Sequence, residues 1–388
     1  QELKVIGSQT AVCTADCIAL SHEGFCADVN VGDEILVDDG EIRMTVKENN
    51  TDHLICIVQD DGVIKKKKSV NVPGTELSLP SLTEKDRDYI SFAVNNGVDF
   101  IAHSFVRTKE DVLAVQEILD KHDSPIKIIA KIENQEGVDN IDEILDHAYG
   151  VMVARGDLGV EIDDAKIPGI QKDLVEKCLA RRRPVIIATQ MMHSMIENPR
   201  PTRAEVNDVA NAIYDGTDAI MLSGETAYGN YPARAVKTMS RIASQVEEQI
   251  EPMNDIAARK INNEISAYLS KAAITATLKL PVKAVVIDTM SGRTARYLAT
   301  YRGTKPVFAH CYDENVMRQL SLSYGVYADF LSGANGVTDF LKRAIPKLVE
   351  QGCFDKQDLI LVLAGSFGLN HGASFIEVST AENMEKRD

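Results

Sequence analysis

The residues best placed for chemistry follow two short apolar runs in the middle of the chain. Apart from Lys127 and Lys131, the runs Ile126–Ile132 and Gly150–Ala154 are apolar, a composition typical of strands buried on both faces of a parallel sheet. The charged residues at the ends of these two runs are Lys131, Glu133, Arg155 and Asp157. Ligands bind at the carboxyl edge of parallel sheets, so we expect these four side chains to converge on one mouth.

Two carboxylates and a lysine at one mouth suit a divalent cation and an anionic substrate. Hard oxygen ligands favour Mg²⁺ or Mn²⁺, and Mg²⁺ is usually held by one or two carboxylates together with substrate oxygens. The alternative is a network of structural ion pairs, which are common at strand edges. Two such clusters at the ends of successive strands favour the metal site.

The segment Val138–Ala148 predicts a helical crossover between the two strands, which makes one βαβ unit. The pattern repeats, because apolar runs begin near Val98, Ile126, Gly150, Pro184 and Asp218, at spacings of roughly 24 to 34 residues. This repeat predicts an α/β fold with five strands of a (β/α)8 TIM barrel, strands four to eight. We expect the first three strands before Gln1, and little activity from residues 1–388 without them.

The flanking regions differ from the barrel repeat. Residues 1–72 predict a small β-barrel lid, because short strands at Glu34–Val37, Ile42–Val46 and Leu54–Val58 alternate with Asp-Gly turns. Residues 73–252 form the partial catalytic barrel. Polar sequence at Met253–Asn263 indicates a boundary, and residues 253–388 predict a C-terminal open α/β domain with strands at Lys283–Asp288, Pro306–Ala309, Tyr327–Leu331 and Leu359–Leu363.

Two loops of the C-terminal domain have features that suit the binding of an anion. Thr289–Thr294 follows a strand and opens a helix, where free N–H groups suit a phosphate, and the glycine-rich stretch Gly365–Gly372 lies beyond another strand. Tight turns explain both loops equally well. In the N-terminal module, the lysines at 65 to 68 are typical of a strand edge that faces solvent. The alternative is that Lys68 faces the phosphates of a nucleotide.

Composition excludes several protein classes. The net charge of −16 argues against binding nucleic acid, and no apolar run approaches the length of a membrane span. The seven cysteines have no metal-ligand spacing, which fits a reducing cytoplasm better than a disulfide framework. We therefore expect a cytoplasmic enzyme with neither nucleic-acid nor membrane partners.

Five motifs together resemble the pyruvate kinase family in order and spacing. They are Lys131-Ile132-Glu133-Asn134, Met152–Gly159, Ala188-Thr189-Gln190-Met191, the loop Pro199–Glu205 and Met221–Thr226. The resemblance extends back through Asn71–Gly74 and Val37–Gly40 and forward through the C-terminal domain. It implies a glycolytic phosphotransferase that converts phosphoenolpyruvate and ADP to pyruvate and ATP with Mg²⁺ or Mn²⁺ and with K⁺, as a homotetramer.

The resemblance also implies roles for individual residues. Glu133 and Asp157 match the family's metal ligands, and Lys131 matches the lysine that stabilises charge on the transferring phosphoryl group. Thr189 and the backbone at Arg155, Gly156 and Asp157 would hold the substrate carboxylate. Ser223 would lie near the proton-delivery network, with Glu225 and Arg107 behind these groups. An effector would use Thr289, Ser291, Gly292, Arg293 and Thr294, where Met290 makes the loop less basic and favours a monophosphate over a sugar bisphosphate.

Two other functions stay open at this point. A divalent-metal aldolase or lyase on the same barrel would use Glu133 and Asp157 with a pyruvate enolate, but it explains neither the inserted β module nor the third domain. A catalytically silent binding or assembly protein is the other class. ATP formation from phosphoenolpyruvate and ADP separates the kinase from both.

Overall fold

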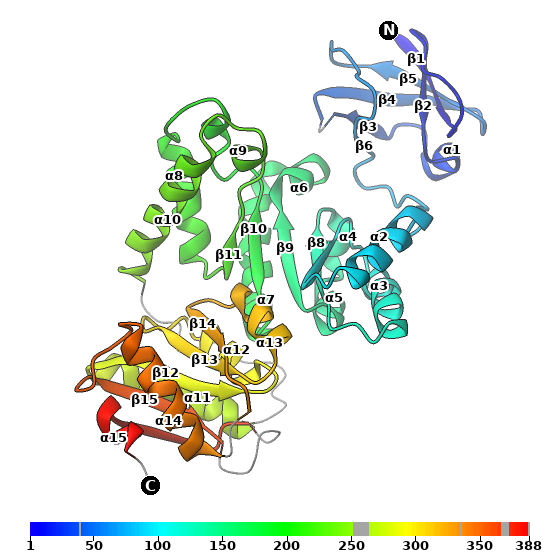
Figure 1. Cartoon of the computed structure of the whole chain (residues 1–388). Helices are drawn as coiled ribbons and strands as arrows, with labels where there is room; N and C mark the ends of the chain where they lie inside the picture. The colour runs from blue at the N-terminus through cyan, green and yellow to red at the C-terminus, as the bar shows by residue number, and fades with distance from the viewer. Residues whose placement is uncertain (39, 251–263, 334–335, 366–371, 387–388) are drawn as a thin grey trace.

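The computed structural model describes residues 1–38, 40–250, 264–333, 336–365 and 372–386, and it contains three sheets arranged in sequence (Figure 1). The N-terminal sheet lies at one end, the cyan-to-green sheet in the middle, and the C-terminal sheet, yellow to red, at the other end. The predicted boundary segment Met253–Asn263 and most of the stretch Gly365–Gly372 lie outside the described residues, as does Asp39 of one predicted turn.

The N-terminal sheet has six strands in the order β2-β1-β5-β4-β3-β6. The strands are β1 (Glu2–Gly7), β2 (Cys17–Leu20), β3 (Glu34–Val37), β4 (Ile42–Asn49), β5 (Leu54–Val58) and β6 (Val70–Asn71), with one short helix, α1 (Phe25–Asp28). Inward-facing apolar residues such as Val5, Ile35 and Leu54 form its core. β3 and β5 have the predicted bounds, whereas β1 and β2 were not predicted. The described pairings do not join β2 to β6, so closure of this sheet into a barrel stays a prediction.

The central sheet has five parallel strands in the order β11-β10-β9-β8-β7, as the βα repeat predicts. The strands are β7 (Phe100–His103), β8 (Lys127–Ile132), β9 (Gly150–Ala154), β10 (Val185–Ala188) and β11 (Ala219–Ile220). The helices are α2 (Glu84–Asn95), α3 (Lys109–Lys121), α4 (Gln135–Asp139), α5 (Ile141–His147), α6 (Arg155–Glu161), α7 (Ile167–Arg181), α8 (Arg203–Tyr214), α9 (Gly224–Ala227) and α10 (Pro232–Glu247). Short 3-10 turns lie at Asp164–Lys166 and His193–Ile196.

The crossover predicted as a turn and a helix at Val138–Ala148 contains the end of α4 and the whole of α5. Asn134 caps α4 by accepting a hydrogen bond from the Gly137 N–H, and α4 then ends at Asp139. Asn140 interrupts the helix, and its amide donates to the Arg107 carbonyl at 3.1 Å. The interruption turns α5 so that Ile141, Ile144 and Leu145 reach the core.

The two faces of the central sheet are occupied differently, which decides where Lys131 points. Side chains alternate along a strand, and in β8 the residues Ile128, Ala130 and Ile132 join the core under the helices. Ile129 belongs to a second cluster on the opposite face. By the same alternation, Lys131 and Glu133 lie on the face of Ile129, away from the covering helices.

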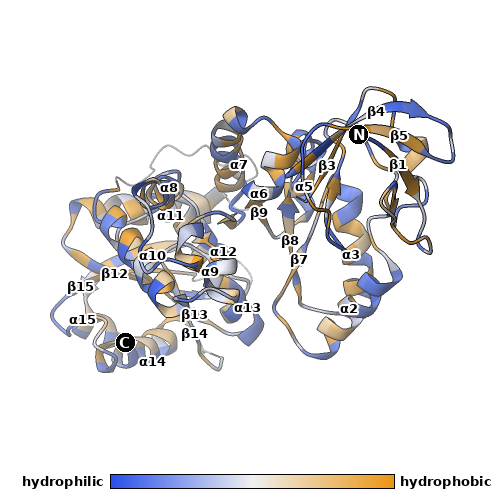
Figure 2. Ribbon diagram, turned by 90° about the horizontal axis from the view of Figure 1, so that it is seen from above, coloured by the Kyte–Doolittle hydropathy of each residue, from blue (hydrophilic) through white to orange (hydrophobic). Residues whose placement is uncertain are grey.

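The C-terminal sheet has the order β14-β13-β12-β15-β16 and forms the middle layer of an α/β/α sandwich. Its strands are β12 (Val282–Thr289), β13 (Val307–Cys311), β14 (Val326–Phe330), β15 (Leu359–Ala364) and β16 (Phe375–Thr380), where β16 is antiparallel and was not predicted. Its helices are α11 (Glu264–Lys279), α12 (Arg293–Thr300), α13 (Glu314–Gln319), α14 (Val337–Glu350) and α15 (Ala381–Glu385), with a 3-10 turn at Leu320–Leu322. In Figure 2, helices such as α10 and α14 alternate between hydrophilic and hydrophobic colours, as helices with one buried face do.

Polar contacts fix the C-terminal sheet against the central one. Arg302 is 2% exposed, donates twice to the Gly216 carbonyl, and lies 2.9 Å from Asp218. Nearby, the Tyr149 hydroxyl donates to the Gln319 carbonyl at 3.3 Å. Buried and paired groups of this kind hold two layers in one register. Among the described residues, no helix is long and apolar enough to cross a membrane.

Candidate active site

Lys131 and Glu133 form a close ion pair at the carboxyl end of β8. Lys131 Nζ lies 2.6 Å from Glu133 Oε1 and donates to the Ser104 hydroxyl at 2.9 Å. Glu133 is 1% exposed, and its second oxygen accepts the Phe105 N–H at 2.6 Å. Phe105 has a φ of 53°, in the left-handed region that costs energy for a residue other than glycine. The loop after β7 is therefore held against the end of β8 by a buried carboxylate.

Arg155 follows β9 directly, and its side chain is committed to the protein interior. Two guanidinium nitrogens donate to the two carboxylate oxygens of Asp208 at 2.6 and 2.7 Å. A third hydrogen bond runs to the Thr189 carbonyl at 2.8 Å. Only 11% of the Arg155 side chain is exposed. Arg155 is thus a positioning residue that ties α6, α8 and the end of β10 together, which leaves backbone groups to meet a ligand.

Thr189 and Gly156 meet where β9 and β10 end. The Gly156 N–H donates to the Thr189 hydroxyl oxygen at 2.7 Å, and that hydroxyl donates to the Ala188 carbonyl at 2.7 Å. Thr189 and Gln190 have φ angles of 66° and 53°. Strained backbone of this kind persists only where the surroundings hold it, and it is frequent at functional sites.

Ser223 lies at the end of β11 and is held by Glu225. The Ser223 N–H donates to Glu225 Oε2 at 2.9 Å, and the Met192 N–H donates to Oε1 at 3.0 Å. Glu225 is 2% exposed, whereas Ser223 is exposed. One buried carboxylate therefore fixes the loop after β10 relative to the loop after β11, and leaves the Ser223 hydroxyl accessible.

The donor set at this edge fits a divalent cation that a substrate helps to bind. Glu133 and Asp157 follow adjacent paired strands, β8 and β9, and Asp157 is partly buried in the first turn of α6. In the ranges that the structure describes, no group of three or more His, Cys, Asp or Glu side chains is placed to hold a metal. Two carboxylates with open coordination positions are the arrangement that Mg²⁺ uses when it is completed by substrate oxygens and water.

The other predicted positions have structural partners. Lys68 pairs with Asp38 at 2.5 Å within the N-terminal sheet. Arg107 hydrogen-bonds Asp111 and the carbonyls of Leu77 and Leu79, so it anchors the linker between the first two sheets. The N-terminal sheet also contacts α6, because the Asn71 amide donates to Glu161 at 3.0 Å. Burial raises the pKa of Glu161.

The loop after β12 is a tight turn. The Gly292 N–H donates to the Thr289 hydroxyl oxygen at 2.9 Å, and Gly292 has a φ of 70°, a conformation that favours glycine. Thr294 is buried, whereas Ser291 and Arg293 are exposed.

Three positioning residues were missed or given little role by sequence reasoning. Asp208, Ser104 and Glu225 act through contacts with residues that are distant along the chain or in another loop. Of the three, Glu225 alone was given a role before the structure, as a supporting residue that the family resemblance implies. Asp208 lies in the middle of an amphipathic helix, where an acid indicates a solvent-facing position.

Family comparisons follow the same division of the chain. A model described as the barrel domain of pyruvate kinase matches residues 2–236, and one described as its alpha/beta domain matches residues 268–379. The chain belongs to the pyruvate kinase family. The motifs that suggested this family therefore identified it correctly.

Relatives and a solved structure agree with the family models. The chain is 46% identical to a pyruvate kinase of Borreliella burgdorferi over 99% of its own length and 81% of that protein. It is 46% identical to a pyruvate kinase of Bacillus licheniformis, of which it spans 63%. A crystal structure of a pyruvate kinase from Cryptosporidium parvum matches 98% of the chain with a TM-score of 0.91 and 33% identity, and the match covers 78% of that chain.

Proposed function

We propose that this protein transfers the phosphoryl group of phosphoenolpyruvate to ADP and so produces pyruvate and ATP in glycolysis. The observation that carries the proposal is the meeting of Lys131, Glu133 and Ser104 at strand ends in a member of the pyruvate kinase family. A buried acid there holds an ammonium group toward a ligand. This arrangement serves an anion that becomes more negative at one oxygen as the reaction proceeds.

The reaction has two steps. In the first, an ADP oxygen attacks the phosphorus, a new P–O bond forms, and the bond to the enol oxygen breaks, which leaves the enolate of pyruvate. Lys131 stabilises the charge on the phosphoryl and enolate oxygens. Glu133 and Ser104 hold the Lys131 ammonium in place through contacts of 2.6 and 2.9 Å.

In the second step, the enolate takes a proton on its methylene carbon. The exposed hydroxyl of Ser223 is the group that we assign to proton delivery, through ordered water, and Glu225 fixes its backbone. The substrate carboxylate would lie against the Gly156 N–H and the Thr189 hydroxyl. These two groups now bond each other at 2.7 Å and are of the right type to bind an anion instead.

Glu133 and Asp157 are the residues that would hold Mg²⁺ or Mn²⁺, and K⁺ is the expected monovalent cofactor. When bound, the divalent ion neutralises phosphate charge and orients the two phosphoryl-bearing substrates. Lys131 cannot fully replace this neutralisation, because its single charge already offsets that of Glu133.

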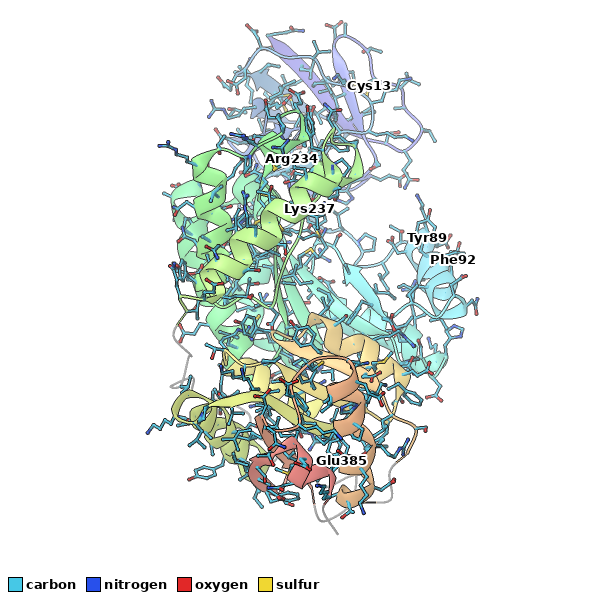
Figure 3. All side chains as sticks on the ribbon, turned by 60° about the vertical axis from the view of Figure 1, so that its left-hand side comes forward. Cys13, Tyr89, Phe92, Arg234, Lys237 and Glu385 are labelled. Carbon is cyan, nitrogen blue, oxygen red and sulfur yellow. The ribbon has the colours of Figure 1, made fainter. Side chains whose placement is uncertain are left out.

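The fold supports a finer assignment of the parts. We assign β7–β11 to five strands of a (β/α)8 barrel, because all five are parallel and consecutive, and the family resemblance implies that they are strands four to eight. β7 and β11 are the edges of this sheet, and Tyr89 and Phe92 on α2 are 61% and 65% exposed (Figure 3). Further barrel units would cover these groups in a closed barrel.

The domain division that we propose is 1–72 for the lid, 73–252 for the barrel and 253–388 for the C-terminal domain. The lid would bring Lys68 toward ADP phosphates. Thr289, Ser291, Gly292, Arg293 and Thr294 would form an effector loop. We also propose a homotetramer in the cytoplasm, as the family resemblance implies.

The test is to mix the intact enzyme with phosphoenolpyruvate, ADP, Mg²⁺ and K⁺, and to measure ATP and pyruvate separately. The proposal predicts equal amounts of both products, and none without the divalent ion. A lyase or aldolase would make no ATP in this mixture. A binding protein would leave phosphoenolpyruvate unchanged.

A further inference from the structure

A second cationic cavity lies between the end of α7 and the start of α12, where the central sheet meets the C-terminal sheet. Its volume is about 270 Å³, and its lining residues are Leu145, Asp146, Arg181, Arg182, Arg183, Arg293, Arg296 and Tyr297. Five of these eight residues are arginines. The cavity is far from the candidate active site in the topology, because Arg183 precedes β10 and the active-site residues follow the strands.

Some arginine nitrogens in this cavity are satisfied by protein groups. Arg183 Nε donates to the Leu145 carbonyl at 3.1 Å, and Arg181 Nη2 donates to Asp142 at 2.5 Å. Other arginine nitrogens in this cavity have no hydrogen-bond partner, although they are shielded from solvent. These are Nε and Nη1 of Arg181 and Nη1 of Arg182. Buried donors are normally satisfied, so unpaired ones indicate a missing acceptor.

The charges are unbalanced as well. Asp146 is the one acid among the described lining residues, and it lies 3.8 Å from Arg181 Nε. Burial, with a further contribution from the charge of Arg296, lowers the pKa of both Arg182 and Arg183. The cationic forms of these two side chains are therefore destabilised by their surroundings, and a bound anion would relieve this cost.

The arginines are held in position by aromatic rings. The Arg182 guanidinium lies 4.7 Å from the centre of the Tyr297 ring, and that of Arg296 lies 5.6 Å from the centre of the Tyr149 ring. Arg182 has a φ of 56° at the end of α7, a position where glycine is the common residue. A side chain kept in this conformation, across from a ring of the other layer, indicates a role beyond ending the helix.

We propose that this cavity binds a small phosphate monoester that bridges α7 and α12. Guanidinium groups match phosphate oxygens in geometry, and several converging arginines are typical of phosphate recognition. A volume of about 270 Å³ accommodates more than a bare phosphate ion. The site differs from the β12 loop proposed for an effector, with which it shares only Arg293. The proposal of phosphate binding at this cavity does not depend on the proposed reaction, because binding is measured without turnover.

Calorimetric titration of the full chain at constant ionic strength tests the proposal, with glycerol 3-phosphate, inorganic phosphate and sulfate as probes. We expect glycerol 3-phosphate to bind more tightly than the two inorganic ions. The double variant Arg182→Gln/Arg296→Gln should lose at least tenfold in affinity. Arg87→Gln on α2 is the matched control, because it removes one exposed charge far from the cavity, and its affinity should stay unchanged.

Two further variants keep the test decisive. Arg293→Gln changes an exposed residue, so it should fold and still weaken binding, even where the double variant proves unstable. Lys131→Met alters the candidate active site and should leave this binding intact. Unchanged affinity in the Arg293 and double variants, or loss of binding in the Lys131 variant alone, would overturn the proposal. Equal affinity for glycerol 3-phosphate and inorganic phosphate would also overturn the choice of a monoester.

Discussion

Glu225 provides the sharpest test of how the strand ends are held together. Its carboxylate is 2% exposed and accepts one backbone N–H from the loop after β10 and one from the loop after β11, at 3.0 and 2.9 Å. Glu225→Gln keeps the size of the side chain but supplies only one acceptor oxygen. The amide nitrogen must then face either the Met192 N–H or the Ser223 N–H.

The structure allows an estimate of the cost. A hydrogen bond to a charged group contributes about 1.5–3 kcal/mol, and a buried donor left without a partner costs a similar amount. Because one of the two hydrogen bonds survives, we expect the free energy of unfolding to fall by about 3 kcal/mol. Displacement of Ser223 should also lower kcat by about 10-fold or more, since small misplacements of reacting groups are costly.

Urea unfolding followed by circular dichroism measures the first effect, and the pyruvate-forming rate of the intact enzyme measures the second. Glu117→Gln is the control. Glu117 pairs with Lys121 at 2.8 Å on the exposed face of α3, so its loss should change neither quantity. If Glu225→Gln unfolds at the same urea concentration as Glu117→Gln, the carboxylate does not fix these loops and our reasoning is wrong.

Three other predictions concern the metal site, the ion pair between Arg155 and Asp208, and a buried histidine. Asp157→Asn should abolish turnover at limiting Mg²⁺, because an amide supplies one neutral oxygen, and turnover like that of the unaltered enzyme would exclude Asp157 as a ligand. Asp208→Asn should lower the free energy of unfolding in urea by about 2 kcal/mol, because it removes the carboxylate that balances the buried charge of Arg155. Asp173→Asn, in the solvent-accessible pair with Lys177, should change this free energy little. Burial lowers the pKa of His310 from 6.5 to about 4. Between these two pH values the folded state therefore binds fewer protons than the unfolded state. The free energy of unfolding should fall by up to about 3 kcal/mol as the pH falls through this window. His310→Leu should flatten this part of the stability profile, and an unchanged profile would show that the histidine is not responsible.

The sequence predicted the parts of the fold that depend on local pattern. Aliphatic runs ending in charge located β8 and β9, because strands buried on both faces need continuous apolar sequence. The predicted bounds of β3 and β5 are those of the structure, because each apolar run ends shortly before an Asp-Gly sequence that breaks the strand pattern. β16 was missed, because its residues are only partly buried at the edge of the sheet and its mixed apolar and polar pattern resembles a loop.

The sequence predicted the sheet edge at which Lys131, Glu133 and Asp157 lie, but it did not predict the residues that hold them there. Lys131, Glu133 and Asp157 follow apolar strands directly, so their shared edge follows from the parallel topology. Asp208 could not be found this way, because its partner Arg155 lies on another element and only tertiary packing brings them together. The direction of the Arg155 side chain was hidden for the same reason.

The measurement that tests the central claim most directly compares Lys131→Met with the unaltered intact enzyme in single-turnover kinetics and in phosphoenolpyruvate binding. Our account holds that Lys131 acts on charge that develops during phosphoryl transfer, so kcat should fall by on the order of 10²-fold or more while substrate affinity changes much less. A variant that transfers phosphoryl groups at the original rate, with only its KM altered, would contradict this account.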